Sequence, residues 1–583
     1  MARGEKRDWR FRFIVILFFL AALGILGRLF FLQITRSEFY LARAQVQQTA
    51  FKVKIPHRGS IFFEDKTGRL TPAATTKTTY ALYINPAVIK DPAAAFARIG
   101  DLAPVSRTEF MAKISDTGLG SRILARGIEK DAAAKIADRA PDGIYLGEED
   151  TRVYPGGTLA SHVLGFVGFS GNSRVGRYGV EESYERVLAG LSGGDDVAAA
   201  SGFSFSLVAL KQKLLNVSDD GADIVLTIDP NLQAFIEKRM VAARERWHGT
   251  AAGALVMDPR SGKVLAMGSV PTFDPNAYGK EKNYDVFINP FVQKIFEMGS
   301  VFKPLTMAAA LDAHVLTPET TYLDEGKLTI DGRTIENFDG KGHGVQSMTQ
   351  VLEQSLNTGA VFAMRRLGGP NLRKYFEAYG LQDPTGIDLP NEIKGNLRNL
   401  ASNREIEFAT ASFGQGVAVT PIELASALAS LANHGEAPRP YVVSRVIRGN
   451  DVIVMTQPRM RGRAVTPETS QTISEMLTLV VDHTLAGGTV KMPAYRIAAK
   501  TGTAQISNKG GKGYSNDYLH TYFGYAPSFD PRFLVLLYLE KPQGVKYSSQ
   551  SLTDSFKDIV KFLISYYEIP PDRAPATASK ASH

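Results

Sequence analysis

A serine and a lysine stand three positions apart in this sequence, at Ser300 and Lys303. Positions i and i+3 share one face of a helix, so Lys303 is expected beside the Ser300 hydroxyl. A serine hydroxyl is a poor nucleophile until a base takes its proton. Lysine can be that base only when burial or a neighbouring cation lowers its pKa from about 10.4 toward neutrality. The pair therefore indicates acyl transfer through a serine ester, with no histidine needed.

Two further motifs follow in chain order, Ser355-Leu356-Asn357 and Lys500-Thr501-Gly502-Thr503. Ser355 would relay a proton toward the leaving group, and Asn357 would hydrogen-bond a substrate amide. Lys500 can supply the neighbouring cation or pair with a substrate carboxylate. Earlier copies at Lys66-Thr67-Gly68 and Ser170-Gly171-Asn172 precede the only S-x-x-K, and we interpret them as coincidental. The ordered trio predicts one catalytic site.

The segments around these motifs predict the elements that position them. Val301–Leu311 is apolar and alanine-rich, which predicts a buried helix, and Pro304 is tolerated only in its first turn. Ser300 would then lie at a helix N-terminus, where free N–H groups favour an oxyanion. Residues 500–505 predict an edge strand on which an extended peptide can lie. Gly502 permits close approach, the small Thr501 and Thr503 leave room beside it, and the N–H groups of Ser300 and Thr503 would form the oxyanion hole.

The remaining pattern after residue 250 places strands first, helices in the middle and strands last. This order predicts an α/β domain in which one antiparallel sheet is sandwiched by helices. The predicted elements are a hairpin of 252–258 and 264–269, helices beginning at Thr420-Pro421 and Thr466-Pro467, strands at 496–505, 521–526 and 533–540, and a final helix over 553–567.

Composition excludes several kinds of chemistry. The 583 residues suit two or three domains. The chain has no cysteine, which excludes disulfides, thiolate catalysis and cysteine-bound metals. Its nine histidines show no metal-binding spacing, so neither a metal nor a cofactor is expected. The net charge of +8 is partly concentrated at the N-terminus and gives no reason to expect a nucleic acid partner.

The N-terminus predicts a membrane anchor. Residues 13–34 form an apolar stretch about as long as a bilayer-spanning helix, and five basic residues precede it. The positive-inside rule places 1–12 in the cytoplasm and the chain after about 35 outside. Arg28 near the far end would either snorkel to the interface or contact a partner helix. A cleaved signal peptide is the alternative, but no small-x-small cleavage site is evident.

The exported part is expected to divide in two. Residues 36–225 mix short strands, helices and turns, including a strand at 201–216, and form a first domain that ends near Asp229-Pro230. Residues 226–568 carry the three motifs. The tail over 569–583 is rich in proline, alanine and serine, which is typical of disorder.

Because it carries these three motifs in this order, the chain resembles a class B penicillin-binding protein, a membrane-anchored peptidoglycan D,D-transpeptidase. The resemblance extends to Arg58-Gly59-Ser60-Ile61, Phe273-Asp274-Pro275-Asn276 and Ser412–Gly416. It implies that Ser300 is acylated, that Lys303 is its base, and that Ser355, Asn357 and Lys500–Thr503 complete the site. It also implies a non-catalytic pedestal over 36–225 and an inner-membrane location with the catalytic domain outside the cytoplasm.

The family also implies partners: stem peptides ending in D-Ala-D-Ala, β-lactams, and a polytopic membrane glycosyltransferase. The Phe296-Glu297 pair before Gly299-Ser300 favours the cell-division type, whereas Met298 departs from the proline usual there and puts the local loop geometry in question. An elongation-type transpeptidase, a D,D-carboxypeptidase and a non-catalytic scaffold stay as alternatives. A β-lactamase is disfavoured by the anchor and pedestal, and a β-lactam sensor would need further membrane helices.

Overall fold

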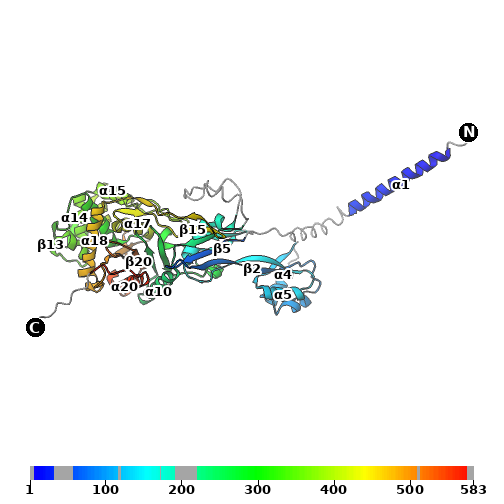
Figure 1. The fold of residues 1–583 in the computed structure, drawn as a ribbon, viewed down its shortest axis with the longest axis horizontal. Helices are drawn as coiled ribbons and strands as arrows, with labels where there is room; N and C mark the ends of the chain where they lie inside the picture. Colours follow the sequence, from blue (N-terminus) through cyan, green and yellow to red (C-terminus); the bar gives the residue numbers. More distant parts are fainter. Residues whose placement is uncertain are drawn as a thin grey trace. The chain divides into compact units, whose positions relative to one another are not determined.

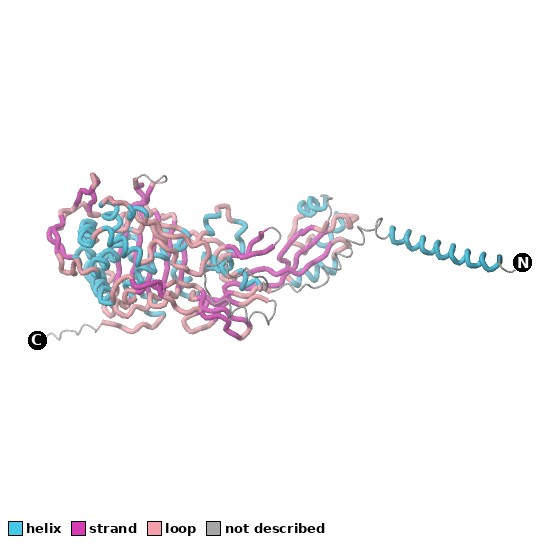
Figure 2. The backbone as a smooth tube through the Cα atoms, turned by 90° about the horizontal axis from the view of Figure 1, so that it is seen from above, coloured by secondary structure: helices cyan, strands magenta, loops and turns pink. Residues whose placement is uncertain are grey.

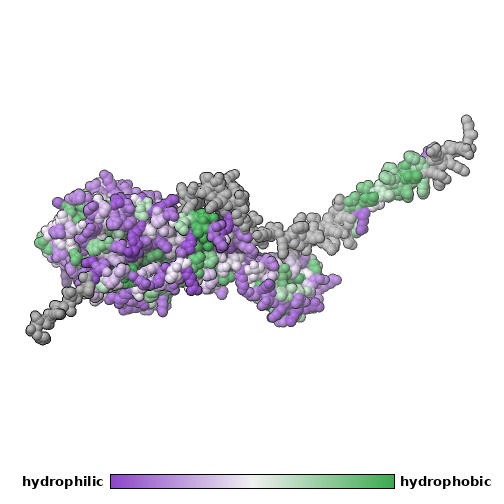
Figure 3. Space-filling model, viewed as in Figure 1, coloured by the Kyte–Doolittle hydropathy of each residue, from purple (hydrophilic) through white to green (hydrophobic). Residues whose placement is uncertain are grey.

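The computed structural model describes residues 5–31, 57–115, 120–170, 173–190, 220–508 and 513–573. The chain forms two compact units, Met1–Pro56 and His57–His583. In the first unit, helix α1 spans Glu5–Phe30, and its stretch Phe11–Phe30 has a mean hydropathy of 2.6. Figure 3 shows hydrophobic residues along this stretch. Twenty helical residues rise about 30 Å, so α1 fits a single-pass membrane anchor.

A seven-stranded sheet begins the second unit, in the order β16-β15-β7-β1-β2-β3, with β4 also paired to β2. Strand β7 runs parallel to β1 and antiparallel to β15. The pair β15 and β16 comes from far beyond the boundary expected near residue 229, so this sheet continues across it. The bounds are β1 Ile61–Glu64, β2 Leu70–Ile84, β3 Arg122–Ile128, β4 Ile144–Val153, β7 Asp223–Leu226, β15 Val443–Arg448 and β16 Asp451–Met455.

Three helices pack against the β2–β3–β4 end of this sheet and enclose a small core of their own (Figure 2). They are α3 Pro92–Ile99, α4 Arg107–Ser115 and α5 Lys130–Arg139. The chain then forms α6 Ser161–Leu164, the hairpin of β5 Phe166–Ser170 and β6 Ser173–Arg177, α7 Gly179–Ser183 and α8 Glu185–Ala189. The strand expected at 201–216 lies outside the described residues.

A buried ion cluster joins these segments. The Glu181 side chain has no exposed surface, and it accepts hydrogen bonds from Arg58 Nε at 2.8 Å and Arg152 Nε at 2.7 Å. Burial alone would raise the pKa of Glu181, but the two guanidinium groups outweigh it and hold that pKa below its usual value. Arg58 of the Arg-Gly-x-Ile motif therefore fastens the start of β1 to α7.

The second sheet is five-stranded and antiparallel, in the order β18-β19-β20-β8-β9, and helices cover both of its faces (Figure 1). Helices α10 and α20 pack on one face, and α12, α17 and α18 lie on the other. This confirms the predicted sandwich. The bounds are β8 Ala251–Met257, β9 Val264–Val270, β18 Ala498–Ser507, β19 Tyr514–Ala526, β20 Phe533–Glu540, α10 Pro230–Arg246, α12 Lys303–Asp312, α17 Pro421–Ala432, α18 Pro467–Leu479 and α20 Thr553–Tyr566.

Shorter elements complete the domain between these helices. They are α11 Pro290–Gln293, β10 Thr321–Asp324, β11 Lys327–Ile330, β12 Arg333–Glu336, β13 Gly344–Ser347, α13 Met348–Glu353, α14 Asn357–Leu367, α15 Gly369–Ala378, α16 Glu405–Ala411, β14 Glu436–Pro438, β17 Met460–Arg463 and α19 Ser548–Ser551. Past α20, Asp572 accepts a hydrogen bond from Arg496 N, and Arg573 pairs with Asp482. Residues from 574 onward lie outside the described part.

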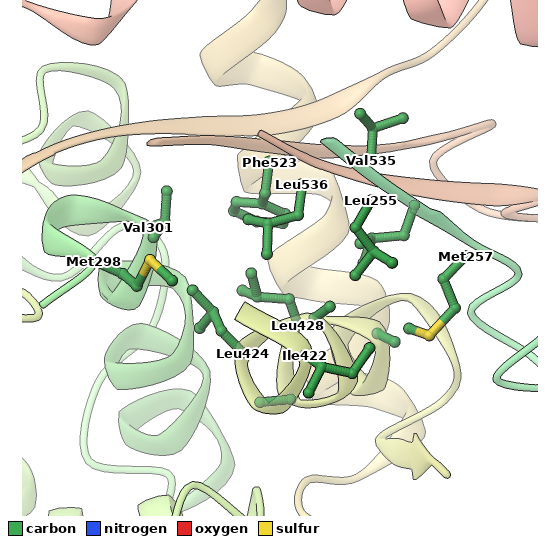
Figure 4. Close-up of a cluster of buried hydrophobic side chains, with 14 of the residues drawn as sticks. Leu255, Met257, Met298, Val301, Ile422, Leu424, Leu428, Phe523, Val535 and Leu536 are labelled. Carbon is green, nitrogen blue, oxygen red and sulfur yellow. The ribbon is translucent and has the colours of Figure 1, made fainter. Parts of the chain in front are cut away.

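The core between the sheet and α17 reaches the turn that carries Ser300 (Figure 4). Side chains from β8, β19, β20 and α17 form one buried cluster with Met298 and Val301, and both of these are fully buried. Burial of such side chains stabilises a fold by about 1.5–3 kcal/mol each. The nucleophile turn is therefore anchored in the main core of the domain.

Helix α17 begins at the predicted Thr420-Pro421 pair and has a capping box, in which the Thr420 side chain accepts from Glu423 N and Glu423 accepts from Thr420 N. Glu423 also accepts from Gly395 N at 2.8 Å and is fully buried. Burial raises the pKa of Glu423 from its usual 4.5 to about 7. The cap thus places an ionisable carboxyl group deep in the domain.

Stability should therefore fall as the pH rises. Because the folded-state pKa of Glu423 is the higher one, its contribution is complete below about pH 4.5 and is lost as pH passes through about 7, a loss of about 3 kcal/mol at most. Thermal unfolding of detergent-solubilised protein between pH 5 and 8 measures this slope. Glu423→Gln should flatten it, and the exposed-helix control Glu475→Gln should not. An unchanged slope in Glu423→Gln would contradict the prediction.

Candidate active site

Ser300 lies in a 3-10 turn, Gly299–Phe302, that runs directly into α12 at Lys303. Pro304 occupies the first turn of α12, as predicted, although the α-helix itself starts three residues after Ser300. Met298, the departure from the family pattern, has φ −88° and a fully buried side chain. That φ lies close to the range of proline, so methionine preserves the course of the loop.

Close packing against β18 places the Ser300 turn beside the third motif. Gly299 has φ +65°, and a Cβ on it would lie 3.2 Å from the Thr503 carbonyl group. A Cβ on Gly502 would lie 2.6 Å from Met298 O and 3.2 Å from Ser300 N. Only glycine fits at both positions. The backbones of Ser300 and Thr503 therefore meet, as an oxyanion hole formed by their N–H groups requires.

Strand β18 is the edge strand of its sheet, as the sequence predicted. It begins at Ala498, two residues later than expected, and the backbone N–H of Arg496 donates to Asp572 rather than to a strand. The outer edge of β18 offers backbone groups to an added peptide strand.

Ser355 lies between α13 and α14 and links the two lysines. Its backbone is left-handed, with φ +57°, which is unusual for a residue with a side chain. Lys500 Nζ lies 2.9 Å from Ser355 Oγ, and Lys303 Nζ lies 3.3 Å from the same oxygen. Lys303 Nζ also donates to the Ser355 carbonyl oxygen at 2.5 Å. One hydroxyl therefore contacts both amino groups.

Both lysines are buried, with 1% exposure for Lys303 and 2% for Lys500. Burial, and then the neighbouring charge of Lys500, hold the pKa of Lys303 well below its usual range. Burial lowers the pKa of Lys500 to about 7. Neither lysine forms an ion pair within the described ranges of the chain. The environment of Lys303 therefore favours its neutral amine, which is the form that a general base requires.

A polar network that sequence reasoning missed holds the start of α14. Asn357 N donates to Asn337 Oδ1 at 3.0 Å, and Asn357 Nδ2 donates to Glu336 O at 2.8 Å. Asn337 in turn donates to the buried Asp324, which also accepts from Thr358 Oγ1 at 2.7 Å. The hydrogen-bonded residues of this network are 13 to 34 positions apart and follow no helix or strand period. The sequence therefore could not indicate that they meet.

A second group was also missed. Glu297 accepts from Gly416 N at 3.1 Å and from Tyr514 OH at 2.9 Å. It ties the Ser300 turn to the Ser412–Gly416 loop and to the start of β19. Burial raises the pKa of Glu297, against the effect of these two hydrogen bonds. The sequence could have indicated Glu297 as a residue of the site, because it lies three positions before the nucleophile.

The earlier K-T-G copy has a structural role elsewhere. Lys66 lies in the turn between β1 and β2, and its Nζ donates to Tyr566 O at 2.6 Å and to Glu568 at 2.7 Å. The other copy begins at Ser170, at the end of β5, and continues outside the described residues. Among the described residues no group of three or more acidic, histidine or cysteine side chains is arranged to hold a metal.

A serine three positions before a buried lysine, in a turn that packs against the edge strand of a helix-covered antiparallel sheet, is the arrangement of a serine acyltransferase that works without histidine. Family models agree over both parts of the chain: the penicillin binding protein transpeptidase domain matches residues 252–561, and the penicillin-binding protein dimerisation domain matches residues 53–226. The chain belongs to the class B penicillin-binding proteins, and it is a transpeptidase.

Individual relatives give the same result. Stage V sporulation protein D of Bacillus subtilis is 31% identical over 500 residues, which cover 84% of this chain and 75% of the relative. Peptidoglycan D,D-transpeptidase FtsI of Escherichia coli K12 is 27% identical over 97% of this chain and 93% of the relative. The crystal structure of penicillin binding protein 3 from Mycobacterium tuberculosis with aztreonam shares the fold, with a TM-score of 0.67 and 24% identity over 89% of this chain and 98% of that one.

Proposed function

We propose that the chain is a D-Ala-D-Ala transpeptidase that cross-links peptidoglycan stem peptides through an acyl-enzyme on Ser300. One observation carries this proposal: the Ser355 hydroxyl contacts the Nζ atoms of both Lys303 and Lys500, beside the Ser300 turn. A neutral lysine at that place can accept the serine proton, and the hydroxyl can pass a proton onward.

The reaction then runs in two halves. Lys303 takes the Ser300 proton while Oγ attacks the carbonyl carbon of the penultimate D-alanine. The resulting oxyanion is held by the N–H groups of Ser300 and Thr503. Ser355 delivers a proton to the departing amine, the peptide bond breaks, and D-alanine leaves. An amine of a second stem peptide then attacks the ester and restores the Ser300 hydroxyl.

The third motif would bind the donor peptide along the edge of β18. Lys500 and the hydroxyls of Thr501 and Thr503 would bind its terminal carboxylate, and Asn357 would bind its backbone amide. Gly502 is needed for β18 to pack against β19 and the Ser300 turn, because a Cβ there would lie 2.3 Å from Thr521 Oγ1 and 2.6 Å from Met298 O. A β-lactam imitates this donor, so penicillin should acylate Ser300. Labelling with a fluorescent penicillin and mapping the adduct tests the proposal.

The amine acceptor distinguishes a transpeptidase from a D,D-carboxypeptidase, which uses water. A non-catalytic scaffold would bind penicillin without turning over a donor peptide. Incubation with a stem peptide and an amine acceptor, with product analysis by mass spectrometry, separates the three functions. We expect the cross-linked product; release of D-alanine alone would assign the carboxypeptidase.

We further propose a role in septal wall synthesis, beside a polytopic glycosyltransferase that contacts the anchor and pedestal. The Phe296-Glu297 pair and the relatives named FtsI support this role. Depleting the protein in its host should give filaments with blocked septa, visible by microscopy. Rounded cells that still divide would assign the enzyme to elongation and leave its chemistry unchanged.

The location in the inner membrane is also a proposal, supported by the apolar stretch Phe11–Phe30 and the basic residues before it. Protease added to spheroplasts should digest nearly all of residues 36–583, because the catalytic domain would lie outside the cytoplasm. Immunoblotting with an antibody against the C-terminal domain measures this. A processed, soluble main species that lacks residues 1–34 would favour the signal peptide instead.

A further inference from the structure

His520 lies directly across from Thr503 where β19 pairs with β18. The imidazole is fully buried and contacts two groups of the segment that follows β20. Its Nε2 lies 3.1 Å from the Lys546 carbonyl oxygen, and its Nδ1 lies 2.8 Å from Ser551 Oγ. A carbonyl oxygen only accepts, so Nε2 must carry the proton. Burial lowers the pKa of His520 to about 4, so the ring is neutral and Nδ1 accepts from Ser551.

The segment held in this way, residues 546–551, touches the substrate strand. Ser548 N donates to Thr503 Oγ1 at 3.1 Å. A hydroxyl oxygen that accepts this bond keeps its own proton for another acceptor. Thr503 is partly exposed on the free edge of the sheet, so that acceptor can be a group of the bound donor peptide. The direction of the Thr503 hydroxyl therefore depends on where Ser548 is placed.

We propose that His520 is a positioning residue which, through the Lys546–Ser551 segment, fixes the Thr503 hydroxyl as a hydrogen-bond donor to the terminal carboxylate of the acyl donor. His520 holds the segment on both sides of Ser548, at Lys546 and at Ser551. The indole of Trp247 adds a third fixed point by donating to Ser551 O at 3.1 Å. This inference rests on the proposed function, because it assigns the group that the Thr503 hydroxyl binds.

The test compares two acyl donors that differ only in the carboxylate: benzylpenicillin and its methyl ester. The second-order rate of Ser300 acylation is measured for each by intact-protein mass spectrometry. His520→Leu removes both ring contacts at similar volume. It should lower the rate with the acid about tenfold more than the rate with the ester, since one hydrogen bond to a charged group is lost. His520→Gln, whose amide can still reach the Lys546 carbonyl, should lose less of this preference.

The chain contains a matched control. His162 is also a buried histidine whose Nε2 lies 2.9 Å from a carbonyl oxygen, that of Val286, and whose Nδ1 lies 3.2 Å from a serine hydroxyl, that of Ser269. Burial likewise lowers its pKa to about 4. Ser269 belongs to β9, at the opposite edge of the sheet from β18. His162→Leu should cost comparable thermal stability and leave the ratio of the acid and ester rates unchanged.

A double substitution shows whether His520 acts through the Thr503 hydroxyl. If His520 acts through the hydroxyl, His520→Leu should not change the acid-to-ester ratio further in a Thr503→Val background. Equal losses for both donors, an equal effect of His162→Leu on the ratio, or a further tenfold change in the Thr503→Val background would each overturn the inference. If His520→Leu does not fold, the same ratio measured in His520→Gln decides. Failure of the wild-type protein to be acylated by either donor would instead reject the proposed function, and this inference with it.

Discussion

Replacing Ser300 with alanine should abolish covalent labelling by penicillin, with a fall of about 10⁴-fold or more in acylation rate. Ser300 is the one hydroxyl residue of the turn Gly299–Phe302, and α12 begins directly after this turn at Lys303. The Cβ of alanine fits the same turn, so the fold should persist. A fluorescent penicillin, a denaturing gel and peptide mapping of the wild-type adduct measure the effect.

Ser355→Ala is the matched control for this substitution. Its hydroxyl contacts both lysines, so its loss should slow acylation, yet the adduct that forms should still map to Ser300. Thermal unfolding of each variant shows that the domain remains folded. Labelling that survives in Ser300→Ala, or an adduct that maps to Ser355, would reject the mechanism.

Lys303→Ala and Lys500→Ala should both impair acylation by penicillin, but at different steps. Removal of a general base typically costs about 10²–10⁴ in rate, so Lys303→Ala should almost stop acylation even at saturating penicillin. Lys500 has a pKa of about 7 and can carry a charge toward the donor carboxylate. Its loss should chiefly weaken binding, with a smaller effect on the acylation step. Stopped-flow measurement over a range of penicillin concentrations separates the two quantities.

The methyl ester of penicillin provides a control for the role of Lys500. Lys500→Ala should affect the acid more than the ester, whereas Lys303→Ala should affect both equally. Near wild-type acylation by Lys303→Ala would mean that another group is the base. Losses of the same kind in both variants would mean that the two lysines act as one unit.

The structure also explains why both lysines tolerate burial. An amino group loses hydration when it is buried, which favours its neutral form and lowers its pKa. Here the hydroxyl and carbonyl oxygens of Ser355 accept hydrogen bonds from Lys303, and no carboxylate among the described residues forms an ion pair with it. A carboxylate partner would raise the pKa of Lys303 and remove its capacity as a base.

Local sequence determined much of this protein. Apolar runs that begin with threonine and proline predicted α17 and α18, and both helices begin at the predicted pairs. The strand β20 spans 533–540, as predicted from its apolar residues. The three motifs and their order predicted the residues of the candidate site, because each combines reactive groups within four positions. Such patterns involve residues that are close together in the sequence, so they can be recognised without the structure.

Tertiary structure decided what depends on contacts between distant segments. The sequence contained no sign that β15 would cross the expected boundary to pair with β7, because strand partners are chosen by packing rather than by spacing. Nor did it place His520 and Ser548 behind Thr503, or Asp324 and Asn337 behind Asn357. Even the low pKa of Lys303 is a tertiary property, since the residue type supplies the amine but burial beside Lys500 supplies the shift. The sequence alone determined which groups are present, and the fold decided their distances and dielectric surroundings, on which their reactivity depends.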